Sequence, residues 1–126
     1  IEEIANTKGL LHYAEMQGVE IIYGKQLHPH NLEAVKNQIE QFANKVDDLY
    51  FTIDMDAFAA AFAPGVSAVA LNGIIPDHNF YELLQFIYRQ PNLVSMDIAE
   101  LNPRFDLDER TVKLAANLIF QFLQKF

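Results

Sequence analysis

Short apolar segments alternate with amphipathic helical patterns along this chain, and this alternation restricts its fold more than any other feature. Three segments are short and rich in β-branched and aromatic side chains, which predicts strands at residues 19–23, 49–54 and 93–98. Apolar residues spaced three and four apart predict helices at residues 8–17, 31–46, 79–89 and 108–126. Strands that alternate with helices form a mainly parallel sheet with right-handed crossovers. We therefore predict an α/β domain, with Asp108 as the N-cap of its last helix.

Composition limits the class of protein. The 126 residues suit one domain, residues 1–126, and the formal charge of −8 argues against a nucleic-acid partner. The absence of cysteine excludes disulfides and thiolate metal sites, which fits a cytoplasmic protein. The longest apolar runs are too short to cross a bilayer, so we expect no membrane partner. The chain begins at Ile1 without a methionine, so we expect it to be a piece of a longer protein.

Two carboxylates, Asp54 and Asp56, stand at the end of the second predicted strand. If both continued the strand, they would share one face, with Cβ atoms roughly 6–7 Å apart. That separation suits one cation, or two cations ~3.5–4 Å apart. Oxygen ligands favour Mg²⁺ or Mn²⁺. The alternative is that the two aspartates only cap the following loop, residues 57–77, which is long enough to be either functional or disordered.

Two longer stretches resemble a known family. "TIDMDAFAAAFAPGVSA" is similar to the second metal-binding motif of the ureohydrolase superfamily, which includes arginase, agmatinase and formimidoylglutamase. "MDIAELNPRFDLDERTVKLAANLIFQFL" resembles the closing strand and last helix of that family. The resemblance covers the whole chain as the C-terminal part of such an enzyme. It implies an arginase-like, three-layer α/β/α fold with a mainly parallel sheet.

The resemblance also implies roles for individual residues. Asp54 would bridge two Mn²⁺ ions, and Asp56 would bind the second of them. Glu100 would pair with a cationic amidine or guanidine, whose N–H donors suit a carboxylate. Asp97 is expected to support the neighbouring loop. The other metal ligands of the family lie around an Asp-Ala-His segment that this sequence lacks, so we expect the chain alone to hold part of the site and to be inactive.

The loop sequence indicates a branch of the family. "APGVSA" lacks the Asp-Pro pair of arginases and agmatinases and resembles the formimidoylglutamase branch, although Val69 replaces a usual proline. The implied reaction is metal-dependent hydrolysis of N-formimidoyl-L-glutamate, an intermediate of histidine metabolism, to glutamate and formamide. A ureohydrolase acting on a guanidine substrate, or a non-catalytic protein with this fold, stays open as an alternative, as does a homo-oligomer.

Basic residues are a further candidate group. An acidic substrate needs cations, which Lys25, His28, His30 and Arg104 could supply. "HPH" at residues 28–30 also has the residue types of a metal site, but a proline turn entering a helix is the interpretation we favour.

Overall fold

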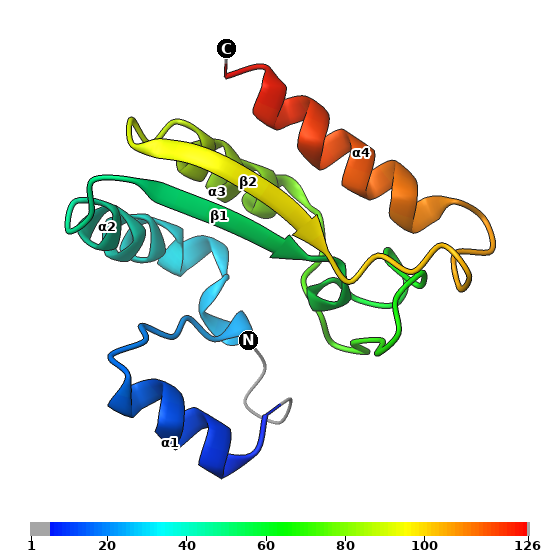
Figure 1. Ribbon diagram of the computed structural model, residues 1–126, viewed down its shortest axis with the longest axis horizontal. Helices are drawn as coiled ribbons and strands as arrows, with labels where there is room; N and C mark the ends of the chain where they lie inside the picture. Colours follow the sequence, from blue (N-terminus) through cyan, green and yellow to red (C-terminus); the bar gives the residue numbers. More distant parts are fainter. Residues whose placement is uncertain (1–5, 126) are drawn as a thin grey trace.

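A computed structural model describes residues 6–125 (Figure 1). The helices and strands are, in chain order, α1 Lys8–Met16, α2 Leu32–Ala43, β1 Leu49–Asp54, α3 His78–Tyr88, β2 Leu93–Ala99 and α4 Arg110–Leu123. Three short 3₁₀ turns lie between them: η1 Gly24–Gln26, η2 Pro29–Asn31 and η3 Met55–Ala57. Most predicted elements are therefore present, with ends that differ by less than one helical turn.

The sheet consists of β1 and β2, which pair in parallel (Figure 1). Leu49 lies opposite Leu93, whereas Tyr50 lies opposite Ser95, so the register shifts by one residue at the start of β1. From there the register is regular and ends with Asp54 opposite Ala99. The predicted α/β fold with a parallel sheet is confirmed, and the carboxyl ends of both strands meet at one edge.

The core lies between the sheet and two helices. Its buried cluster includes Ile53 of β1, Leu84 of α3, and Ala115 and Leu118 of α4. Burial of such apolar side chains supplies most of the stability of a domain of this kind. On the other face of the sheet Tyr50 is exposed. Near-continuous apolar strands had suggested burial throughout, but β1 alternates between covered and exposed positions, and β2 also contains exposed residues.

The prediction of a strand at residues 19–23 is wrong. The segment is extended but lies apart from the sheet, between α1 and α2 (Figure 1). A strand exists only where a neighbouring strand takes up its backbone hydrogen bonds. Periodicity and β-branching identify a segment that can form a strand, but they do not provide that neighbour.

The predicted N-cap of the last helix is also wrong. Asp108 bonds to the Arg110 backbone and guanidinium, and the N-cap position belongs to Glu109, whose side chain makes no capping bond. The first turn is capped instead from Asp106, whose carboxylate accepts hydrogen bonds from the backbone N–H groups of Thr111 at 3.1 Å and Val112 at 2.9 Å. Phe126, the predicted last residue of this helix, lies outside the described residues.

The long loop at residues 57–77 is ordered by its own backbone. Phe58 pairs with Ile74, and Ala59 pairs with Ala70, in isolated parallel bridges. Phe58 is 1% exposed and packs edge-on against Phe80, with ring centroids 5.2 Å apart. A Cβ atom at Gly73 would lie 2.5 Å from the backbone of Phe58 and Ala59, so only glycine permits this approach.

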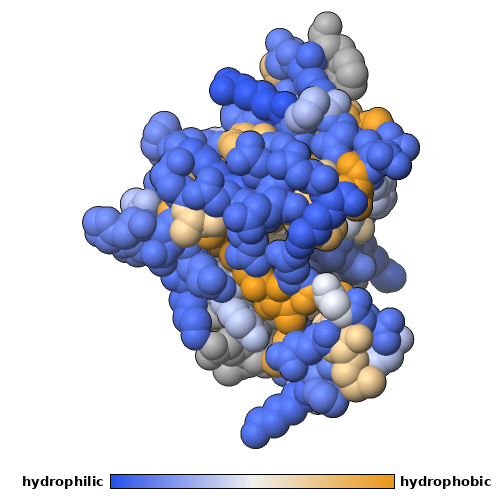
Figure 2. Space-filling view, turned by 90° about the vertical axis from the view of Figure 1, so that its left-hand side faces the viewer, coloured by the Kyte–Doolittle hydropathy of each residue, from blue (hydrophilic) through white to orange (hydrophobic). Residues whose placement is uncertain are grey.

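The surface on the side of α1 and α2 is partly apolar. A hollow between the segment after α1 and helix α2 is lined by Val19, Ile22, Ile39 and Phe42, among others. Figure 2 shows apolar surface exposed between polar regions on this side of the molecule. Within residues 6–125, no helix combines the length and the apolar character that spanning a membrane requires.

Candidate metal and substrate site

Asp54 and Asp56 lie at the carboxyl edge of the sheet, but not both in the strand. Asp54 is the last residue of β1, whereas Asp56 belongs to the short turn η3. Met55, between them, is fully buried. The sequence-based argument that both carboxylates share one strand face is therefore wrong. The chain turns after Asp54, and burial of the Met55 side chain anchors this turn against the core.

The two carboxylates still affect each other. Partial burial, and secondly the negative charge of Asp54, raise the pKa of Asp56 above its ordinary value. Ionisation of Asp56 therefore costs more free energy than ionisation of a free aspartate. A divalent cation would remove this penalty, because it neutralises both charges and accepts oxygen ligands. The donor set fits the hard divalent metal that the sequence suggested.

Glu100 follows directly after β2. Its neighbour Ala99, the last residue of β2, pairs with Asp54, so Glu100 lies one position beyond the strand end beside Asp54. Glu100 is exposed and has a φ angle of +62°, a left-handed conformation that non-glycine residues rarely adopt. Such strained backbone is concentrated at functional sites, where the surrounding structure holds it in place. The structure thus brings Glu100 to the same edge as the two aspartates.

The two loops at this edge are joined to each other. Val66 pairs with Leu101 in an antiparallel bridge, and the backbone N–H of Asn102 donates to the Gly65 carbonyl at 2.8 Å. The Gly65 N–H in turn donates to the hydroxyl oxygen of Thr111 at 2.7 Å, in a buried position. The loop after Asp56, the loop after Glu100 and the start of α4 therefore form one connected unit.

Thr111 and Asn102 are residues that the sequence analysis missed. Thr111 is fully buried at the start of α4, and a buried polar side chain usually has a specific partner. Its partner lies 46 residues earlier in the chain, so spacing along the sequence gives no signal for it. The Asn-Pro pair at residues 102–103 is visible in the sequence. The sequence does not reveal, however, that Asn102 bonds to the facing loop.

Asp97 was expected to support the loop, and this prediction is wrong. Asp97 lies within β2 and accepts a hydrogen bond from the Tyr50 hydroxyl of β1. The side chain of Thr52, and secondly that of Tyr50, hold the pKa of Asp97 below its ordinary value. The residue therefore joins the two strands across the exposed face of the sheet.

His28 and His30 form a local turn. The Nδ1 atom of His28 accepts a hydrogen bond from the His30 backbone N–H at 3.4 Å, and both residues are exposed. This geometry supports the proline-turn interpretation at the entry to α2. In the part of the chain that the structure describes, no three side chains among His, Asp and Glu gather as a metal-binding group.

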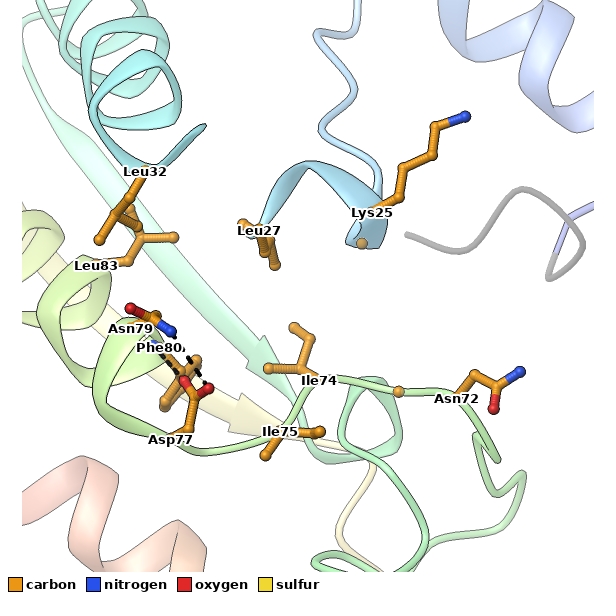
Figure 3. Close-up of a pocket in the computed structure, with 12 residues that line it drawn as sticks. Lys25, Leu27, Leu32, Asn72, Ile74, Ile75, Asp77, Asn79, Phe80 and Leu83 are labelled. Carbon is orange, nitrogen blue, oxygen red and sulfur yellow. Dashed lines mark hydrogen bonds between the residues drawn. The ribbon is translucent and has the colours of Figure 1, made fainter. Parts of the chain in front are cut away.

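A cavity of about 360 Å³ lies beside the long loop (Figure 3). It separates η1 from the segment that leads into α3, and its walls include Leu27, Ile74 and Phe80. Lys25 is also at its border, but the side chain extends away from the other labelled residues (Figure 3). Asp54, Asp56 and Glu100 do not line this cavity, so it is separate from the carboxylate edge.

Comparison with known proteins identifies the family. The sequence model of the arginase family matches residues 1–124. The chain belongs to the arginase family. Its relatives include the formimidoylglutamase of Staphylococcus carnosus, which is 42% identical over 123 residues. That match covers 98% of this chain but only 40% of the relative. The chain thus spans about two fifths of the length of the curated relatives it matches.

Solved structures confirm the arginase-like fold. The crystal structure of formimidoylglutamase from Bacillus subtilis aligns with a TM-score of 0.89 and 25% identity, over 99% of this chain and 39% of that one. The structure of Trypanosoma cruzi formiminoglutamase with Mn²⁺ aligns with a TM-score of 0.81 and 19% identity, over 99% of this chain and 42% of that one. The suspected membership of the ureohydrolase superfamily is confirmed.

Proposed function

We propose that this chain is the C-terminal portion of an arginase-like domain in a metal-dependent, cytoplasmic hydrolase of linear amidines. The proposed reaction is hydrolysis of N-formimidoyl-L-glutamate to glutamate and formamide. The single observation that carries the proposal is the 42% identity to a formimidoylglutamase, which extends over nearly the whole chain. The three carboxylates at one edge of the sheet agree with it, because carboxylates can hold metal ions and bind a cationic substrate.

Asp54 and Asp56 would hold two Mn²⁺ ions together with ligands from outside this chain. The donors fit, because two close carboxylates raise the pKa of one of them and are stabilised by a cation. A relative with this fold contains Mn²⁺. When bound, the metal pair supplies a nucleophile from water at neutral pH. Two carboxylates do not complete such a site, so the chain on its own would be inactive.

Glu100 would bind the amidine. A protonated formimidoyl group presents N–H donors, and a carboxylate accepts them in charge-assisted hydrogen bonds. Glu100 lies one residue beyond the register partner of Asp54, and a substrate bound there would have its amidine carbon on the side of the proposed metal ligands. Orientation of this kind is a large part of the rate enhancement in enzymes.

A substitution of Asp54 tests the metal assignment in the full-length protein that contains this segment. We expect Asp54→Ala to lose bound Mn²⁺ and to abolish formamide release, since a bridging ligand is shared by both ions. The matched control is Asp47→Ala, which removes an exposed carboxylate before β1. Metal content by elemental analysis and formamide by a colorimetric assay decide the question. Near-normal turnover with a full metal complement would refute the role of Asp54.

A further inference from the structure

We propose that Asn102 is a positioning residue that latches the Glu100 loop to the loop at residues 64–68 and so fixes Glu100 for substrate binding. The inference rests on the proposed function for the role of Glu100, but the latch itself is defined by contacts within this chain.

Glu100 requires an external constraint. Its φ angle of +62° is left-handed, and its side chain is exposed, so its own packing does not hold the conformation. Without support, the backbone would relax toward ordinary angles, and the carboxylate would leave the edge that it shares with Asp54. Residues that follow closely in the chain are best placed to provide the support.

Asn102 makes four hydrogen bonds within this region, one of which its backbone carbonyl accepts from the Phe105 N–H at 3.1 Å. Its backbone N–H donates to the Gly65 carbonyl at 2.8 Å. Its side-chain Nδ2 donates to the hydroxyl oxygen of Ser67 at 3.2 Å, and its Oδ1 accepts from the backbone N–H of Arg104 at 3.2 Å. The Asn102 side chain thus connects the loop at residues 64–68 to the turn that begins after Asn102. An amide suits this place because one group supplies both a donor and an acceptor.

The facing loop is a rigid base for this latch. Gly65 is bonded to the buried hydroxyl of Thr111. A Cβ atom at Gly65 would lie 2.4 Å from the Cβ atom of Asp106, so the loop lies directly on the segment that caps α4. Because the loop is fixed to α4, a tie from Asn102 to Ser67 transmits that rigidity to Glu100. The Val66–Leu101 bridge reinforces the same connection.

The test uses the full-length protein and a double-mutant cycle between Asn102 and Ser67. The variants are Asn102→Ala, Ser67→Ala and the double variant, with Ser67→Thr retaining the hydroxyl and Asn37→Ala as a matched change on the exposed surface of α2. Three quantities are measured: KM and kcat for N-formimidoyl-L-glutamate, Mn²⁺ content, and hydrogen exchange of the amides at residues 65–67 and 100–102. Ser67 is exposed, so its variants keep the test valid even if Asn102→Ala folds poorly.

We expect Asn102→Ala to raise KM about 3- to 10-fold, the size of one lost hydrogen bond. Exchange at both loops should accelerate, while kcat and Mn²⁺ content change little, because Asn102 acts through the group that binds substrate. Ser67→Ala should produce part of this effect, the double variant no more than Asn102→Ala, and Ser67→Thr and Asn37→Ala none.

Two results with the Asn102→Ala variant would overturn the proposal. Unchanged exchange in Asn102→Ala would remove the latch, and faster exchange with unchanged KM would make it purely structural. A wild-type protein that hydrolyses no amidine would instead refute the proposed function, and the positioning role with it. The exchange data would still show in that case whether the loops are latched.

Discussion

Replacement of Thr111 by valine tests how the site is attached to the fold. The Thr111 hydroxyl is fully buried, accepts the Gly65 N–H at 2.7 Å, and bonds to the Asp106 carboxylate. Valine keeps the shape of the side chain and removes only the hydroxyl. The Gly65 N–H is then left in a buried position without an acceptor, and the Asp106 cap loses one of its donors.

The expected loss of stability follows from these contacts. A buried donor without a partner costs about 1–3 kcal/mol. The matched variant Thr111→Ser keeps the hydroxyl and removes one buried methyl group, which costs about 0.8 kcal/mol for the lost transfer alone. Thr111→Val should therefore be destabilised by about 2 kcal/mol and Thr111→Ser by about half as much. The difference identifies the hydrogen bond, since packing alone would rank the two variants in the opposite order.

Urea unfolding followed by circular dichroism measures both values. For a slope of about 2 kcal/mol per molar urea, Thr111→Val should lower the midpoint by about 1 M. The pKa of Asp106 should rise in the same variant, because the hydroxyl is one of the groups that lower it. A valine variant as stable as the wild type, or more stable than the serine variant, would refute the claim that this bond anchors the loop.

Three further predictions concern the carboxylates. Glu100→Gln in the full-length protein should retain Mn²⁺ and lose about 10- to 100-fold in kcat/KM, the size of one charge-assisted hydrogen bond; unchanged kinetics would remove Glu100 from the site. Burial and the charge of Asp54 raise the pKa of Asp56 above 3.8, so the folded metal-free protein binds this proton more tightly than the unfolded chain. The contribution of Asp56 to the free energy of unfolding should therefore fall as pH rises from 3.8 through the pKa of Asp56 in the folded protein. Asp54→Asn should lower that folded-state pKa, as measured by NMR titration of the Asp56 carboxyl. Finally, the 126-residue chain alone should bind Mn²⁺ weakly in a calorimetric titration; two tight sites would show that it contains ligands beyond Asp54 and Asp56.

Local pattern was sufficient for most of the fold. The segments at residues 49–54 and 93–98 form strands because they pair with each other in parallel. The segment at residues 19–23 has similar composition, yet it forms no strand, because pairing is a long-range property that periodicity does not contain. The N-cap was misplaced for a related reason. Asp106, Asp108 and Glu109 are all acidic, and only the turn of the chain decides which carboxylate reaches the first N–H groups of α4.

The residue types of the candidate site and its place at one edge of the sheet could be proposed from the sequence, whereas the turn and the loop contacts that arrange these residues could not. Parallel strands end at one edge, so Asp54 and Glu100 could be placed together from the sequence. The turn at Met55 could not be foreseen, because it depends on a core position that opens only once the helices pack. The connection of Gly65 to Thr111 joins residues 46 positions apart, for which a single sequence offers no signal.

Hydrolysis by the full-length, Mn²⁺-loaded protein tests the central claim most directly. N-formimidoyl-L-glutamate, arginine and agmatine are supplied separately at equal concentration, and formamide and urea are measured. We predict formamide from N-formimidoyl-L-glutamate and no urea from the other two substrates. Urea from arginine or agmatine would contradict the assigned substrate, and the absence of any product would contradict the proposed hydrolase.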